Sequence, residues 1–159
     1  AAPGAIPKGG GERAVVTYVE DGDTAKLLRG NGSQVNCRID KIDAPETSKS
    51  NGKPGQPFGD QAKKTLQGMI DNKEVTLRIT RPEDKWGRVG CQIEVEGSNV
   101  DLVMVQAGAA WLYRRYANDS NLVKAEQEAR TAKRGLWSEP SPVNPENFRR
   151  SLEKAREGR

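Results

Sequence analysis

The sequence predicts an α+β fold in which helices pack on the outside of a small closed β-barrel. Segments of alternating or β-branched apolar residues come first, one helical segment interrupts them, and further helical segments follow, without internal repeats. With 159 residues, of which 34% are apolar and 30% charged, the chain has the size for one domain with a modest core. This order is typical of a five-stranded barrel with about three helices, and an OB-type barrel is the simplest fold of that class.

Three strands are expected before the first helix. The run 14–19 is β-branched and aromatic and ends at an Asp-Gly turn, and a second strand, 24–28, leads into an Asn-Gly hairpin signal. In the third strand, up to residue 40, apolar and polar residues alternate, so Arg38 and Asp40 are expected on a solvated face. The opposite, core-facing side carries Val35, Cys37 and Ile39.

The remaining elements follow a polar Gly/Pro/Ser/Lys loop that runs through residue 57. A helix is expected at 59–70, and two alternating strands at 74–79 and 88–95. Glycines mark the ends of two further helices, at 100–107 and 121–133. The buried stripe of the first helix is expected to consist of Ala62, Leu66 and Met69.

The two ends of the chain differ in composition from this body at 12–137. Residues 1–11 are mainly Ala, Pro and Gly and are expected to form a flexible lead. Residues 138–159 begin as a proline-rich linker and continue as a basic tail that can form a helix. The small residues at the start fit a mature N-terminus from which a signal peptide has been removed, and no apolar run is long enough to span a bilayer.

Composition excludes several kinds of chemistry. Histidine is absent, which rules out Ser-His and Cys-His catalysis and histidine metal ligands. Two cysteines are too few for a typical structural zinc site. Any reaction must therefore use carboxylates, Lys, Arg, Tyr or a cation held by oxygen ligands. The net charge of +4 favours an acidic partner such as nucleic acid.

Two pairs of carboxylates stand at strand ends. Asp21 and Asp23 flank a glycine, and Asp43 and Glu46 flank Ala44-Pro45, so each pair can converge on a hard cation. Taken alone, each pair also fits a plain turn.

Two arginines on strands, Arg38 and Arg88, complete the candidate set. A guanidinium presents a planar fork of donors that matches phosphate oxygens. A single strand arginine is more often only solvated, but Arg38 is followed five and eight residues later by Asp43 and Glu46. This spacing favours a site that binds phosphate beside a metal ion.

Four motifs, in order, resemble those of the staphylococcal-nuclease-like (thermonuclease) domains, a family known from bacteria. They are Val19-Glu20-Asp21-Gly22-Asp23-Thr24, Arg38-Ile39-Asp40-Lys41-Ile42-Asp43-Ala44-Pro45-Glu46, Lys85-Trp86-Gly87-Arg88 and Arg134-Gly135-Leu136-Trp137. Each motif is short, but their order on compatible elements makes the combined signal strong. The resemblance covers roughly residues 15–137.

The resemblance implies an OB-fold endonuclease, a phosphodiesterase that hydrolyses single- and double-stranded DNA and RNA with one calcium ion and leaves 3′-phosphates. Asp23 and Asp43 would supply metal carboxylates and Ala44 a backbone carbonyl, although the family often has Thr at the Ala44 position. Glu46 would be the general base. Oxygen ligands alone also allow Mg²⁺ or Mn²⁺.

The two arginines would bind the scissile phosphate and stabilise the charge that develops on it. The segment 111–116 matches the family region that lines the nucleotide site. We expect Tyr116 to contact substrate, with Lys85, Arg114 and Arg115 at phosphates, while a solvated basic turn is an equal alternative. Lys49 and Lys53 are further candidates for the DNA backbone.

Two further side-chain predictions concern packing. Trp86 is expected to pack against the barrel rather than to stack on a base. Cys37 and Cys91 lie on apolar strand faces, so they are either a disulfide or two buried thiols. The pair, with the mature-looking N-terminus, favours a bacterial periplasm or the extracellular space.

Two other classes of protein fit parts of the pattern. A non-catalytic OB-fold protein would bind nucleic acid without cutting it, but would have no use for three carboxylates among its arginines. An interaction module with a basic tail would leave the ordered motifs unexplained. We therefore expect an enzyme, acting as a monomer and without membrane insertion.

Overall fold

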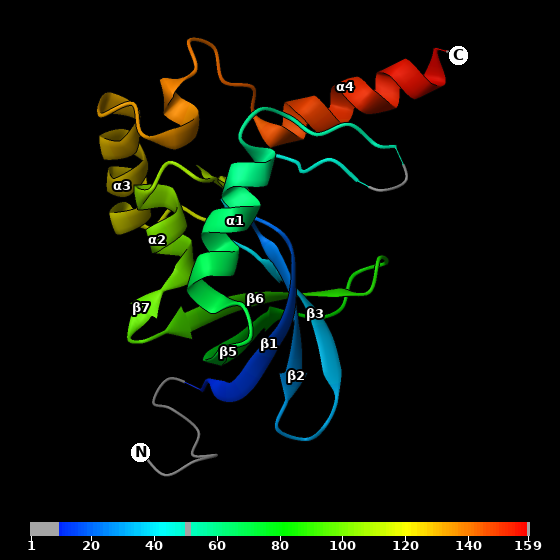
Figure 1. Cartoon of the computed structure of the whole chain (residues 1–159), viewed down its shortest axis with the longest axis vertical. Helices are drawn as coiled ribbons and strands as arrows, with labels where there is room; N and C mark the ends of the chain where they lie inside the picture. Colours follow the sequence, from blue (N-terminus) through cyan, green and yellow to red (C-terminus); the bar gives the residue numbers. More distant parts are fainter. Residues whose placement is uncertain (1–9, 50–51, 159) are drawn as a thin grey trace.

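The structure, a computed structural model, describes residues 10–49 and 52–158 and contains a closed five-stranded barrel (Figure 1). The predicted α+β, OB-type fold is confirmed. Most of the lead expected at 1–11 lies outside the described residues. The barrel strands are β1 (Glu12–Asp21), β2 (Thr24–Arg29), β3 (Gln34–Ile39), β5 (Glu74–Arg81) and β6 (Arg88–Val95).

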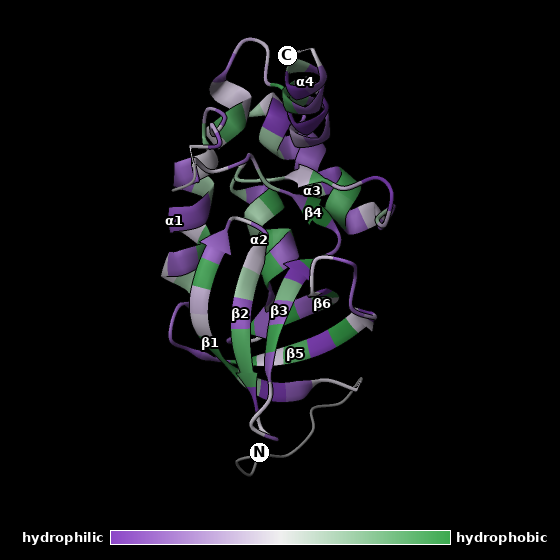
Figure 2. Ribbon diagram, turned by 90° about the vertical axis from the view of Figure 1, so that its right-hand side faces the viewer, coloured by the Kyte–Doolittle hydropathy of each residue, from purple (hydrophilic) through white to green (hydrophobic). Residues whose placement is uncertain are grey.

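The barrel closes through a parallel pair. Antiparallel pairing links β3, β2, β1, β5 and β6 in that spatial order, and β3 then pairs with β6 in parallel, with Cys37 opposite Val89 and Ile39 opposite Cys91. Hydrophobic and hydrophilic residues alternate along the strands in Figure 2, and buried positions alternate with more exposed ones along β1 and β6. The largest fully buried side chains of the five barrel strands are Val16, Val19, Leu27, Ile39, Leu77 and Ile93.

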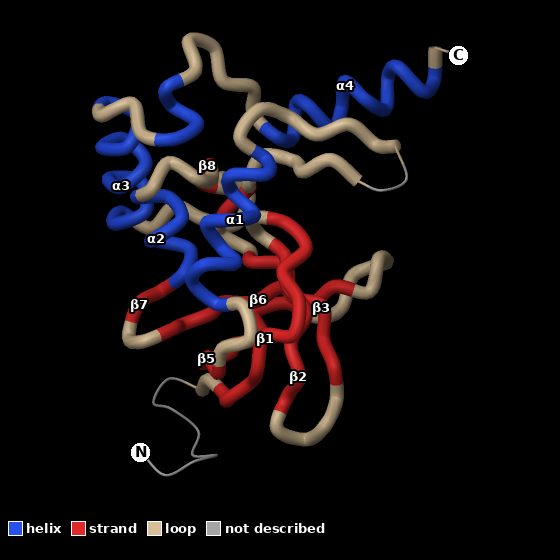
Figure 3. The backbone as a smooth tube through the Cα atoms, in the orientation of Figure 1, coloured by secondary structure: helices blue, strands red, loops and turns tan. Residues whose placement is uncertain are grey.

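Four α-helices lie outside the barrel and gather towards one of its ends (Figure 3). The fourth comes from the segment expected to be a tail and extends away from the body at the end opposite the start of β1. None of these helices is long and apolar enough to cross a membrane. They are α1 (Gly59–Ile70), α2 (Val100–Gln106), α3 (Ser120–Thr131) and α4 (Pro145–Glu157), with a 3₁₀ turn at Gly135–Ser138.

Three two-residue strands complete the fold. β4 (Ile42–Asp43) pairs with β8 (Trp111–Leu112), which brings the segment after β3 beside the aromatic segment 111–116. β7 (Ser98–Asn99) extends the edge at β6. The buried face of α1 is close to the predicted stripe, except that Ile70 is fully buried and Met69 only packs partly against the core.

Cys37 and Cys91 form a disulfide across the closing pair of strands. Their Cα atoms are 5.7 Å apart and both residues are fully buried. The disulfide alternative is thus confirmed. The bond fastens β3 to β6, at the place where the barrel closes.

Removing the disulfide should destabilise the barrel. The cysteines are 54 residues apart, and a closed loop of that size predicts a loss of about 4 kcal/mol in the free energy of unfolding. The Cys37→Ala/Cys91→Ala double variant should therefore unfold at a clearly lower urea concentration than the oxidised wild type. An unchanged midpoint would mean that the bond does not restrain the unfolded chain.

Candidate active site

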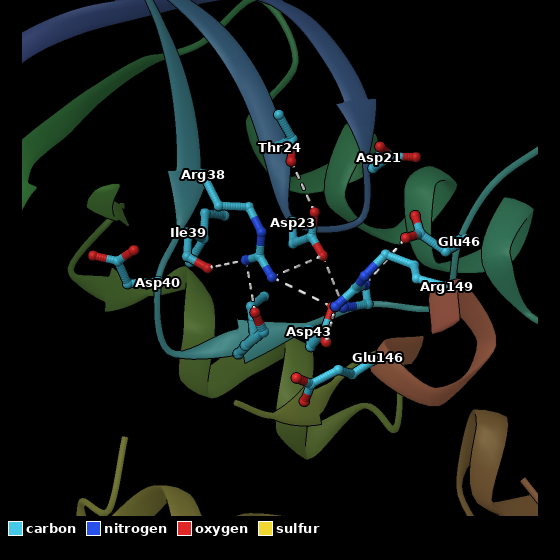
Figure 4. A network of polar contacts seen from close by, with 12 residues as sticks. Asp21, Asp23, Thr24, Arg38, Ile39, Asp40, Asp43, Glu46, Glu146 and Arg149 are labelled. Atoms are coloured by element: carbon cyan, nitrogen blue, oxygen red, sulfur yellow. Dashed lines mark hydrogen bonds and ion pairs between the residues drawn. The ribbon is translucent and has the colours of Figure 1, made fainter. Parts of the chain in front are cut away.

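Four of the predicted site residues meet at the end of the barrel where the β1–β2 turn, β3 and β4 come together (Figure 4). Asp23 is in the β1–β2 turn, Arg38 is on β3, Asp43 ends β4, and Glu46 is in the loop after it. Asp23 and Asp43 are both buried. Below, Asp23, Asp43 and Glu46 are called the carboxylate cluster.

Asp23 is held by two donors from different segments. The hydroxyl of Thr24 donates to its Oδ1 at 2.8 Å, and the amide of Ala44 donates to its Oδ2 at 2.9 Å. The second bond fixes the β1–β2 turn to the residue that follows Asp43. The sequence-predicted metal residues Asp23, Asp43 and Ala44 are therefore brought together.

Arg38 is buried, not solvated as the strand pattern predicted, and Asp40 is buried too. The Nη1 atom of Arg38 donates to the carbonyl oxygen of Ile39 and, at 2.7 Å, to that of Ile42. Its Nη2 lies 3.3 Å from Asp43 Oδ1 and 3.6 Å from Asp23 Oδ2. The prediction failed because alternation identifies the outer face of a strand but does not show that β4 covers it.

The main chain of Glu46 is fixed although it lies in an irregular loop. The backbone amide of Glu46 donates a hydrogen bond to the side-chain oxygen of Gln56 at 3.0 Å. The backbone amide of Gln56 in turn donates to the backbone carbonyl of Glu46 at 2.9 Å. The first residue of α1 packs against the same carbonyl, since a Cβ on Gly59 would lie 2.0 Å from the Glu46 oxygen. The close approach requires glycine at this position.

The Gly59→Ala variant should displace Glu46 as well as destabilise the protein. Overpacking of this kind costs about 1–3 kcal/mol, and the clash is with main chain that cannot rotate away. We expect a lower midpoint of urea unfolding and a lower kcat. Gly68→Ala, in the same helix and with open space around the added methyl, is the matched control and should be stabilising by up to about 1 kcal/mol. Equal behaviour of the two variants would contradict the packing argument.

Burial raises the pKa of both Asp43 and Glu46, and the negative charge of Asp23 adds to the effect. Hydrogen bonds from Arg149, on α4, act in the opposite direction. A carboxylate with a raised pKa is a stronger base near neutral pH, which suits the role expected of Glu46.

Arg149 was missed by the sequence analysis. Its Nη1 donates to Asp43 Oδ1 and to Glu46 Oε1, both at 3.0 Å, and its Nη2 donates to Asp43 Oδ2 at 3.0 Å. In the sequence Arg149 is 106 residues from Asp43 and 103 residues from Glu46. Only the basic character of the tail hinted at such a contact, and nothing in it singled out this arginine.

Asp21 lies beside the carboxylate cluster but is paired with a lysine side chain. Lys49 Nζ is 2.6 and 2.7 Å from its two carboxylate oxygens, and the Thr47 hydroxyl donates to it as well. Lys49, expected at the DNA backbone, is thus an ion-pair partner of Asp21 in this structure.

Arg88 does not join the carboxylate cluster in the described structure. It lies opposite Asn36 in the β3–β6 pair, and its Nε is 3.3 Å from Asp84 Oδ2. Burial alone would raise the pKa of Asp84, but the amides of Arg88 and Trp86 donate to its carboxylate and lower it.

Trp86 is 67% exposed, so the expectation that it packs against the barrel is wrong. The ammonium of Lys85 lies 4.5 Å from the indole and the guanidinium of Arg88 5.3 Å from it. The tip of the β5–β6 turn therefore presents an exposed aromatic ring next to two cations.

A line of aromatic and cationic side chains connects Arg38 with Tyr116. The Arg38 guanidinium is 5.5 Å from the Tyr113 ring, and Tyr113 meets Tyr116 edge to face at 5.5 Å. Arg81 lies 4.7 Å from the Tyr116 ring and is itself held by Asp40, with Nε 2.8 Å from Oδ1. Sequence analysis proposed Tyr116 but missed Tyr113 and Arg81, because their proximity depends on the β4–β8 pairing.

The two arginines next to these tyrosines are both in ion pairs. Arg114 Nη2 lies 3.1 Å from Glu126, a buried carboxylate, and Arg115 Nη2 lies 3.1 Å from Glu146 at the start of α4. Both arginines remain largely exposed.

Comparison with known proteins identifies the family to which this chain belongs. Residues 36–139 match the model of the family described as staphylococcal nuclease homologue. The chain belongs to the staphylococcal nuclease family. It is therefore a nuclease, a phosphodiesterase of the endonuclease class.

Individual relatives of this nuclease carry consistent names. A Shigella flexneri protein named micrococcal nuclease is 33% identical over an alignment 162 residues long, which covers 94% of this chain and 87% of the relative. An Escherichia coli protein named uncharacterized endonuclease is 37% identical over 131 residues, 82% of this chain and 80% of the relative. A Haemophilus influenzae protein of the same name is 33% identical over 135 residues, 85% of this chain and 71% of the relative.

The donor set of the nuclease fits a hard cation but does not enclose one. No three carboxylate or cysteine side chains among residues 10–49 and 52–158 converge as a complete metal-binding group. The expected set has only two carboxylates and one carbonyl, so water and substrate oxygens would supply the rest of the six to eight ligands that Ca²⁺ takes. The guanidinium on Asp43 and Glu46 shows that these oxygens accept a cation.

Proposed function

We propose that this nuclease hydrolyses single- and double-stranded DNA and RNA with limited sequence specificity, uses one Ca²⁺ ion and leaves 3′-phosphates. The observation that supports it most is the meeting of three carboxylates with two arginines at the barrel end: Arg38 contacts Asp23 and Asp43, and Arg149 contacts Asp43 and Glu46. Carboxylates this close repel each other, and a bound cation would offset that repulsion.

Asp23, Asp43 and the carbonyl of Ala44 would hold the cation. When bound, it would supply positive charge that offsets the charge on the phosphate during attack. Asp23 is positioned for this role by the hydroxyl of Thr24 and the amide of Ala44, which leave its carboxylate little freedom.

Glu46 would take a proton from the attacking water as the water oxygen bonds to phosphorus. The bond from phosphorus to the 5′-oxygen then breaks and this oxygen takes up a proton from solvent water, so that the phosphate stays on the 3′-oxygen and the other fragment ends in a 5′-hydroxyl. Arg38 and Arg88 would bind the phosphate oxygens and stabilise their growing charge. For Arg88 this requires its guanidinium to leave Asp84 and turn towards the carboxylate cluster.

Contacts of substrate with Tyr116, Lys85, Arg114 and Arg115 would explain limited sequence specificity. Arginine and lysine read the phosphate backbone, which is the same for every sequence, and an aromatic ring can stack on any base. The exposed Trp86 between Lys85 and Arg88 adds a second aromatic face.

The disulfide supports action in an oxidising compartment, because such bonds persist there and are rare in the cytosol. We propose a bacterial periplasm or the extracellular space, with the protein acting as a monomer.

Analysis of product ends tests this proposal. The purified protein is incubated with 5′-labelled single-stranded DNA, duplex DNA or RNA in Ca²⁺, Mg²⁺, Mn²⁺ or EDTA. We expect fragments from all three substrates in Ca²⁺, with 3′ ends that a polymerase extends only after phosphatase treatment. Binding without fragments in every metal would instead support the non-catalytic barrel. Fragments that are extended directly would contradict the proposed side of cleavage.

A further inference from the structure

Arg149 occupies oxygens that the proposed mechanism needs for other purposes. It contacts both carboxylate oxygens of Asp43 and one oxygen of Glu46, from a helix outside the barrel (Figure 4). An arginine side chain is always charged in proteins, so Arg149 places a full positive charge against Asp43 and Glu46. A divalent cation on Asp43 would lie next to this guanidinium, and the two positive charges would repel each other.

The beginning of α4 holds the guanidinium in place. Gln56 Nε2 donates to the Val143 carbonyl at 2.9 Å, Asn144 caps the helix through the Glu146 amide at 2.9 Å, and Glu146 pairs with Arg115. Gln56 is the residue that also fixes the main chain of Glu46. The docked start of α4 is therefore tied to the same loop as the expected base.

The rest of α4 has little to hold it. From Arg150 to Gly158 every residue except Leu152 is exposed, and Figure 1 shows the helix extending away from the barrel. A helix with few buried contacts along most of its length undocks at low cost. The Arg149 contacts thus account for much of what keeps it against the carboxylate cluster.

We propose that Arg149 is an internal counter-cation of the metal site, and that α4 docking and metal binding exclude each other. In the metal-free protein Arg149 bridges Asp43 and Glu46; metal binding displaces it and leaves the Glu46 carboxylate open to the attacking water. Because binding equilibria are reciprocal, α4 weakens metal binding by the same factor by which the metal weakens α4 docking. The inference rests on the proposed metal-dependent function.

Calorimetric titration of Ca²⁺ into the full chain tests the exclusion. Couplings between sites are typically about 5- to 150-fold, so Arg149→Gln should bind Ca²⁺ tighter than wild type by a factor in this range. Arg150→Gln is the matched control, since Arg150 is on the same helix, pairs only with Glu146 in the described structure and should leave the affinity unchanged.

Hydrogen exchange of the α4 amides gives a second readout that does not depend on activity. Saturating Ca²⁺ should speed exchange in α4 of wild type and of Arg150→Gln, and should change it little in Arg149→Gln, whose helix is already released. Slower exchange with Ca²⁺, or equal Ca²⁺ affinities of wild type and Arg149→Gln, would overturn the proposal. Arg149→Gln with unchanged affinity and reduced cleavage would make Arg149 a phosphate-binding residue instead.

Cleavage of DNA by the same three proteins separates the two hypotheses. If all three bind Ca²⁺ and cleave, but Arg149→Gln has the wild-type affinity, only the exclusion fails. If Arg149→Gln binds Ca²⁺ more tightly but none of the proteins cleaves, the exclusion stands and the proposed function fails. If none of them binds Ca²⁺ at millimolar concentration, both fail.

Discussion

Glu46→Gln is expected to lower kcat by about 100- to 10,000-fold, the range that a positioned general base contributes. Glutamine keeps the shape of the side chain and can still accept a hydrogen bond from Arg149, but it takes no proton from water at neutral pH. The loss should be in kcat and not in KM, because Glu46 is assigned to the proton transfer and not to binding. Steady-state cleavage of a fluorescent oligonucleotide at saturating Ca²⁺ measures both constants.

Folding is the control for this variant. Because the main chain of Glu46 is fixed by Gln56 and Gly59 and not by its own carboxylate, the circular dichroism spectrum and the midpoint of urea unfolding should stay near those of wild type. A folded Glu46→Gln protein with a kcat within a few-fold of wild type would remove Glu46 from the mechanism.

Arg38→Ala and Arg88→Ala should each lower kcat by about 100- to 1,000-fold, the usual loss when one donor aimed at developing charge is removed. Arg38 also donates hydrogen bonds to two backbone carbonyls, so its alanine variant should lose stability too. Arg88 has an ion pair with Asp84 and no other ion pair in the described structure. Arg38→Lys separates the effects, because it keeps the charge but not the planar fork. The same cleavage assay, with urea unfolding beside it, gives both quantities.

A strand arginine far from the carboxylate cluster serves as the control for these variants. Arg13 is on β1 and pairs with Glu74, so Arg13→Gln should leave kcat unchanged. Near-normal turnover of Arg88→Ala would mean that its guanidinium stays with Asp84 during catalysis, and Arg38 alone would then bind the phosphate.

Regular elements with a clear period were predictable from the sequence. The expected helix at 59–70 and strand at 88–95 have the observed bounds, because each shows a full amphipathic pattern between strong end signals. β1 is longer than expected at both ends, where charged residues extend the strand. β4, β7 and β8 were missed, since two residues are too few to show any period.

The site was predictable as a set of residues but not as an arrangement. Short motifs proposed Asp23, Asp43, Glu46 and Arg38, whose meeting depends on turns that the sequence marks well. The burial of Arg38 and the approach of Tyr113 depend on the β4–β8 pair, and the contact of Arg149 on a docked helix more than 100 positions away. Such long-range contacts leave no local pattern in a single sequence.

The most direct test of the metal-dependent mechanism is cleavage of duplex DNA by the purified wild-type chain across a Ca²⁺ titration, with EDTA as the zero point. The mechanism predicts no fragments in EDTA and cleavage that rises with Ca²⁺ and then saturates. Cleavage at full rate in EDTA would show that the carboxylate cluster works without a metal ion and would contradict the account.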